Sequence, residues 1–184
     1  MRVPRTFLFA DLSGFTNYTA ANGDDAAGSL LASFRALTRE VASDRGVRIA
    51  KWLGDGCMVV AVDETDGVRF ALELQERSTP LCAPLTVRIG MATGYALLFE
   101  GDDYIGSAVN LASRLCDAAG PCVVLMPASQ LDTLPTGVDA HPHPALNLRG
   151  FPGPVDVVQL SGHMSSTDGR NDTGELWTRS PFVA

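Results

Sequence analysis

The chain has 184 residues, of which 46% are hydrophobic, and this length and composition suit one globular domain with a buried core. The 14 lysines and arginines are outnumbered by 21 aspartates and glutamates, giving a net charge of -7, and no segment gathers the basic residues. A phosphate backbone requires a basic face, so we expect no nucleic-acid partner. No run of about 18 apolar residues occurs, so we expect no membrane span in this chain.

The four cysteines are Cys57, Cys82, Cys116 and Cys122, and they stand far apart without the paired spacing of zinc or redox sites. We expect all four to be buried, reduced thiols. This pattern predicts a cytoplasmic protein.

The first half of the chain predicts a strand, a helix and a hairpin. The apolar run 6–10 indicates a buried strand that ends at Asp11. Apolar residues at helical spacing predict an amphipathic helix over 24–44, capped within 22–25. The β-rich runs 47–53 and 57–62 flank Gly54-Asp55-Gly56, a strong hairpin-turn signal.

The second half predicts helices over 67–76 and 107–118 and strands over 87–91, 123–126 and 155–160. We expect His141 and His143 in a solvated, proline-rich loop, and His163 in a solvated tail. This order predicts an α+β fold with helices packed on a mostly antiparallel sheet. We expect the domain to cover 1–162, and the polar segment 163–184 to be a disordered tail.

Two carboxylates, Asp11 and Asp55, would converge if their strands are neighbours. Oxygen ligands of this kind suit Mg²⁺ or Mn²⁺, which also bind substrate phosphates. An aspartate in a turn is more often only a turn former, so both interpretations stay open for these two residues alone.

Asn110 and Arg114 stand four residues apart on the predicted helix 107–118, so their side chains share one face. Together they would suit a phosphate or a ribose. A surface or capping pair is the alternative interpretation.

Three segments, FADLSGFT at 9–16, KWLGD at 51–55 and YIGSAVNLASR at 104–114, resemble the signature segments of the class III adenylyl and guanylyl cyclase catalytic domain, in its bacterial type. Their order and spacing also fit, and the similarity covers residues 5–161. The resemblance implies a ferredoxin-like, palm-like core of order βααββαβ. It further implies an adenylate cyclase that makes 3′,5′-cyclic AMP from ATP with two Mg²⁺ or Mn²⁺ ions.

Residue by residue, the resemblance implies that Asp11, Asp55 and the backbone carbonyl of Leu12 bind the metals. Phe15 and Thr16 would then face the triphosphate.

The resemblance also assigns residues to the rest of the nucleotide. Lys51 and Asp103 match the pair that reads the purine, with Asp102 as the alternative if the alignment shifts by one residue. Asn110 matches the residue that orients the ribose, and Arg114 the transition-state arginine. Arg149 matches the position at which family members carry a basic residue that binds the terminal phosphates of the nucleotide.

A head-to-tail homodimer is implied as well, because in this family each active site takes the metal aspartates from one subunit and the purine, ribose and transition-state residues from the other. The segment 95–103 is shorter than the hairpin that reaches the partner in many members, which predicts a weaker dimer. A catalytically silent, nucleotide-binding dimerisation module and a guanylate cyclase remain the alternative functions.

Overall fold

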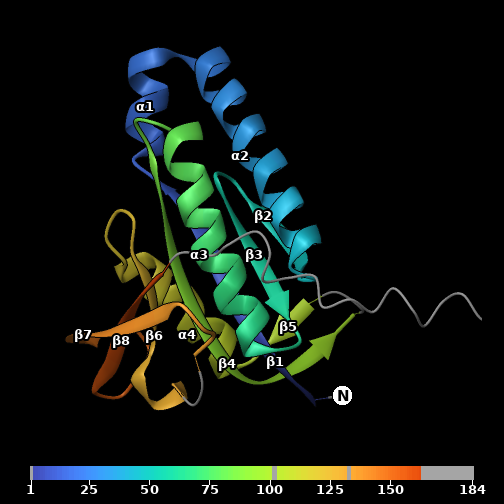
Figure 1. Ribbon diagram of the computed structural model, residues 1–184, viewed down its shortest axis with the longest axis vertical. Helices are drawn as coiled ribbons and strands as arrows, with labels where there is room; N and C mark the ends of the chain where they lie inside the picture. Colours follow the sequence, from blue (N-terminus) through green and yellow to red (C-terminus); the bar gives the residue numbers. More distant parts are fainter. Residues whose placement is uncertain (1, 101–102, 132–133, 163–184) are drawn as a thin grey trace, which may run out of the picture.

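A computed structural model of the protein describes residues 2–100, 103–131 and 134–162. Within these ranges eight strands form one sheet in the order β2-β3-β1-β4-β6-β8-β7, with β5 paired to β4 (Figure 1). The elements in the first part are β1 (Arg2–Ser13), α1 (Phe15–Asn22), α2 (Asp24–Asp44), β2 (Arg48–Leu53), β3 (Gly56–Ala61), α3 (Glu64–Leu81) and β4 (Thr86–Phe99). They are followed by β5 (Asp103–Ile105), α4 (Ser107–Ala118), β6 (Val124–Pro127), a short 3-10 helix (Ala128–Gln130), β7 (Val138–Asn147) and β8 (Pro154–Gly162).

The first seven elements follow the order βααββαβ, which confirms the predicted α+β, palm-like core. Neighbouring strands run antiparallel except for β4 and β6, which are parallel. Helix bounds over 24–44 and 107–118 match the prediction, although Gly23 rather than a polar side chain stands at the start of α2.

The two faces of the sheet carry different helices, and β1 alternates between them. Leu8, Ala10 and Leu12 belong to the main core with α2 and α3. Phe7 and Phe9 point the other way and pack with α4, which lies behind the sheet in Figure 1. By the same alternation Asp11 lies on the α4 face.

The strands that carry the site are longer than predicted. β1 continues past Asp11 to Ser13, because its outer residues still pair with β4. β4 continues from Thr86 to Phe99 and forms a hairpin with β5. Asp11 therefore lies inside a strand, with a neighbouring strand on each side.

The prediction of a loop around His141 and His143 was wrong, because both residues lie in β7. The sequence was misleading because Pro142 and Pro144 interrupt this strand. Prolines are tolerated there because β7 is an edge strand, which pairs only with β8 within the ranges that the structure describes. His163 and the predicted tail 163–184 lie outside the described residues.

Three of the four cysteines are buried as predicted, whereas Cys122 is exposed, in a turn with a φ of 56°. Burial raises the pKa of the Cys57 and Cys116 thiols to about 12, so both remain protonated at neutral pH. Among the described helices, none combines the length and the apolarity that a bilayer crossing requires.

We predict that Gly90→Ala destabilises the domain, because Gly90 is where β4 meets α4. A Cβ atom there would lie 2.1 Å from the backbone nitrogen of Cys116 and 2.4 Å from the carbonyl oxygen of Ala112. Backbone atoms of a helix cannot move aside as the end of a flexible side chain can, so the clash has to separate α4 from β4. We expect Tm to fall by about 5 to 10 °C in a thermal unfolding measurement.

The matched control is Gly28→Ala on α2, where an added Cβ meets nothing within 4 Å. Its Tm should stay unchanged or rise slightly, because alanine is the better helix former. An equal fall in both variants would contradict the close contact between α4 and β4.

Candidate active site

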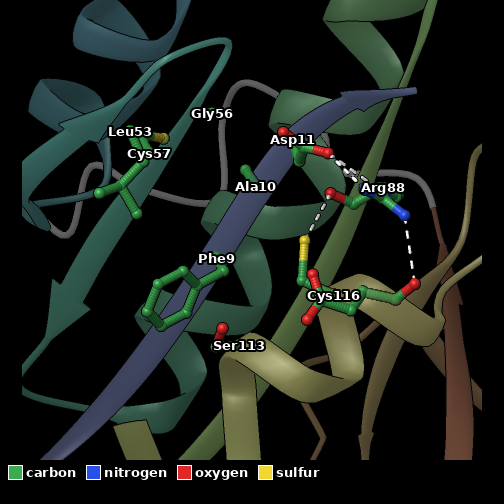
Figure 2. Close-up of a pocket in the computed structure, with 10 residues that line it drawn as sticks. Phe9, Ala10, Asp11, Leu53, Gly56, Cys57, Arg88, Ser113 and Cys116 are labelled. Carbon is green, nitrogen blue, oxygen red and sulfur yellow. Dashed lines mark hydrogen bonds and ion pairs between the residues drawn. The ribbon is translucent and has the colours of Figure 1, made fainter. Parts of the chain in front are cut away.

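A cavity of about 300 Å³ opens between the central strands and α4 (Figure 2). Asp11 and Arg88 form one wall, on neighbouring strands. Ser113, Cys116 and Asp117 of α4 form another. The remaining lining residues are Phe9, Ala10, Leu53, Gly56 and Cys57.

Asp11 is held by Arg88, which lies directly opposite it on β4. The Nε and Nη2 atoms of Arg88 donate to Oδ2 of Asp11 at 2.9 and 2.6 Å, and Nη1 donates to the carbonyl of Asp117 at 3.2 Å. Both side chains are about three-quarters buried, where charge-assisted hydrogen bonds are strong. Arg88 was not predicted as a site residue, although a charged residue between Val87 and Ile89 in an apolar strand was a signal for one.

Asp55 lies in the turn between β2 and β3, close enough to Asp11 for the two charges to interact. Partial burial raises the pKa of the Asp55 carboxyl above its usual 3.8, and the charge of Asp11 raises it further. The backbone N–H of Asp55 and the positive charge of Arg88 lower this pKa, but by less than burial and Asp11 raise it.

Gly56 allows this approach. It pairs with Asp11, and a Cβ atom on it would lie 2.7 Å from the carbonyl oxygen of Ala10 and 3.0 Å from Oδ1 of Asp11.

The donor set at this cavity fits a hard divalent cation. Two carboxylates that repel one another gain from a cation between them, and Mg²⁺ and Mn²⁺ prefer oxygen ligands. Among the described residues, no group of three or more histidine, cysteine or acidic side chains is arranged so that it could hold a metal ion by itself. A cation held by Asp11 and Asp55 would therefore complete its coordination with carbonyls, water or substrate phosphates, as Mg²⁺ commonly does. The side chain of Leu12, the third predicted metal residue, is buried in the main core.

A second cavity, of about 410 Å³, brings together Asn110, Arg114 and Arg149. Asn110 and Arg114 extend from one face of α4, and Arg149 comes from the turn between β7 and β8. Arg114 also donates to Oδ2 of Asp117 at 2.9 Å. Ser107, Gly150 and Phe151 complete the lining.

Lys51 of β2 and Asp103 of β5 form an ion pair, with their side chains 44% and 48% exposed. Tyr104, next to Asp103, packs edge-on against Phe7 with ring centroids 5.3 Å apart. This packing fixes β5 against the sheet and places Asp103 near β2. Asp102, the alternative partner, lies outside the described residues.

Phe15 and Thr16 begin α1, directly after β1 and the left-handed Gly14. Phe15 is partly buried against the main core, whereas Thr16 is exposed. Both residues follow Asp11 closely in sequence.

No family model matches the chain. An uncharacterised protein of Mycobacterium tuberculosis is 38% identical over 160 residues, which cover 87% of this chain and 42% of that protein. An adenylate cyclase of Streptomyces coelicolor is 35% identical over 118 residues, covering 64% of this chain and 31% of that enzyme. This chain thus spans less than half the length of these relatives.

Solved structures share the whole fold. The adenylyl cyclase CyaB from P. aeruginosa superposes with a TM-score of 0.79 at 25% identity, over 90% of this chain and 97% of that one. The guanylate cyclase domain of RhGC from Catenaria anguillulae, solved with GTP, gives a TM-score of 0.76 over 89% of this chain and all of that domain. Its identity of 18% shows a common fold alone.

We predict that Asp55→Asn raises the Tm of the metal-free domain at pH 7. The pKa of Asp55 is raised on folding, so the folded state holds its proton more tightly than the unfolded state does. The wild type therefore loses stability as the pH rises through the raised pKa, and the asparagine variant does not. The gain in Tm should shrink as the pH falls toward 4.

Thermal unfolding between pH 4 and 8, with a metal chelator present, measures this difference. Asp139→Asn, at an exposed position on β7, is the control for the loss of one negative charge. An Asp55→Asn variant that is no more stable than wild type at pH 7 would refute the interpretation.

Proposed function

Since this chain has a class III nucleotidyl cyclase catalytic domain, we propose that it converts ATP to 3′,5′-cyclic AMP and pyrophosphate. One observation carries the proposal: Asp11 lines one cavity and interacts electrostatically with Asp55 in the neighbouring turn, while Asn110, Arg114 and Arg149 line a second cavity. A catalytically silent module would have no need to keep both sets of residues.

In this proposal Asp11 and Asp55, with the carbonyl of Leu12, hold two Mg²⁺ or Mn²⁺ ions. When bound, these ions lower the pKa of the ribose 3′-hydroxyl and neutralise charge on the phosphates. Arg88 holds Oδ2 of Asp11 through two hydrogen bonds, so the carboxylate keeps one orientation. The start of α1, at Phe15 and Thr16, faces the triphosphate.

The residues of the second cavity act on the ribose and the phosphates. Asn110 orients the ribose so that its 3′-oxygen attacks the α-phosphorus in line with the departing pyrophosphate. Arg114 donates to the α-phosphate oxygens, where negative charge builds up as the new bond forms. Arg149 binds the terminal phosphates and stabilises the pyrophosphate as it leaves.

The purine is read by Lys51 and Asp103. Adenine offers N1 as an acceptor and its amine as a donor, which match an ammonium and a carboxylate. Guanine presents the reverse pattern. Both side chains are about half exposed and already adjacent, so a base can reach them. This pair favours ATP over GTP, although guanylate cyclase domains share the fold.

A head-to-tail homodimer brings the two sets of residues together. In one chain they line separate cavities, so a second copy has to place its Arg114 beside the Asp11 of the first. The β4–β5 hairpin offers a contact surface, because large apolar side chains on it are exposed to water. These are Tyr95, Leu97, Phe99 and Ile105, between 39% and 70% exposed.

We predict that the purified protein makes cyclic AMP from ATP with Mn²⁺, and that GTP is used at least about tenfold less well, because Lys51 and Asp103 mismatch guanine. Chromatographic detection of both cyclic nucleotides, at high protein concentration and with Mg²⁺ or Mn²⁺, measures this. No product above a protein-free control would refute the cyclase proposal, and preference for GTP would refute the assigned base.

We predict that Asp11→Ala and Arg114→Ala each lower kcat at least about 100-fold, but that mixing them restores activity. Random assortment makes half of the dimers mixed, each with one intact site, so about a quarter of wild-type activity should return. A mixture of Asp11→Ala with Asp55→Ala is the matched control, because both changes fall in the same half of the site. Recovery in neither mixture, despite mixed dimers shown by mass spectrometry, would exclude the shared site.

A further inference from the structure

Two arginines of α2 stack on Trp52 in the hairpin that carries Asp55. The Cζ atoms of Arg35 and Arg39 lie 5.0 and 5.1 Å from the centre of the Trp52 ring, which is cation–π distance. The two arginines are four residues apart, so they share one face of the helix. Their contacts with the ring are nearly equal.

Arg35 makes one contact that Arg39 does not. Its Nη2 atom donates to the carbonyl oxygen of Gly54 at 2.8 Å. Its Nε atom is buried without a hydrogen-bond partner in the described part of the chain. Burying an unpaired donor is unfavourable, and an apolar side chain could pack on Trp52 without that cost. Packing on Trp52 therefore does not by itself explain why a guanidinium stands at this position.

The bond to Gly54 acts directly on Asp55. The carbonyl of Gly54 and the N–H of Asp55 belong to one planar peptide unit, so fixing the first fixes the second. The N–H of Asp55 in turn influences its own side chain, because it lowers the pKa of the Asp55 carboxyl. Gly54 has a φ of 64°, and glycine has more backbone freedom than other residues, so a hydrogen bond to its carbonyl restricts the conformations open to this turn.

We propose that Arg35 is a positioning residue for Asp55: it holds the Gly54–Asp55 peptide so that the Asp55 carboxylate is directed toward the metal position beside Asp11. This inference rests on the proposed function, in which Asp55 binds metal. Arg35 itself touches neither metal nor nucleotide and acts through the backbone of the turn.

The test is Mn²⁺ affinity, measured without nucleotide by the electron paramagnetic resonance signal of free Mn²⁺. Arg35→Leu keeps apolar cover over Trp52 but removes the donor, and we expect its Kd for Mn²⁺ to rise about tenfold, as for other residues that orient metal ligands. Arg39→Leu is the matched control, with an expected Kd within about twofold of wild type. Arg35→Lys retains a donor and should recover part of the loss.

Asp55→Asn separates this inference from the proposed function. If Asp55→Asn weakens Mn²⁺ binding but Arg35→Leu does not, the positioning role is wrong and the metal site stands. If Asp55→Asn binds Mn²⁺ as tightly as wild type, Asp55 is not a metal ligand, and the positioning role of Arg35 is refuted with it. Equal losses in Arg35→Leu and Arg39→Leu would show that packing on Trp52, rather than the bond to Gly54, sets the turn.

Thermal unfolding checks that each variant is folded. Should Arg35→Leu not fold, Arg35→Met and Arg39→Met, which also lack a donor, replace the leucine pair under the same criterion. A rise of Kd in the first variant alone supports the positioning role, and equal affinities overturn it.

Discussion

The pairing of β1 with β3 on one side and β4 on the other is the constraint on which the site depends. This register places Asp11 opposite Gly56 and also opposite Arg88. A shift by one residue would turn Asp11 into the core beneath α2 and α3 and bring Leu12 to the α4 face. The buried residues on both sides of β1 exclude that shift, so the hydrophobic pattern fixes the position of the carboxylate. The chemistry of Asp11 is thus specified by residues that take no part in it.

Helix α4 joins the two cavities because it touches both. Its close contact at Gly90 brings the carbonyl of Asp117 within reach of Arg88, while the side chain of Asp117 holds Arg114. A continuous series of polar contacts therefore runs from Asp11 through Arg88 and Asp117 to Arg114. Since Asp117 and Arg114 are partly exposed, this outer contact is weak, and Arg114 could exchange it for the phosphate contact that the proposed function assigns to it.

Local signals in the sequence predicted much of this fold. The bounds of α2 and α4 followed from regular apolar spacing, and the β2–β3 turn followed from the Asp-Gly step. Contacts between distant residues escaped prediction. Arg88 binds Asp11, which is 77 positions away, and Arg35 binds Gly54, which is 19 positions away. No local sequence pattern indicates either partner. β7 was missed for a different reason: its prolines contradict strand propensity, and only its place at the sheet edge makes them acceptable.

The β2–β3 hairpin has a further consequence in the proposed dimer. Lys51 and Asp55 stand four residues apart on it, yet in a head-to-tail pair they belong to different active sites, one reading a purine and the other binding metal. Trp52 lies between them in sequence and is fixed by the two arginines of α2. A movement of α2 against the sheet would therefore displace a base-reading residue of one site and a metal ligand of the other together. In the proposed dimer this hairpin would connect the two sites mechanically, because β2 and β3 are paired with each other from Arg48 to Leu53.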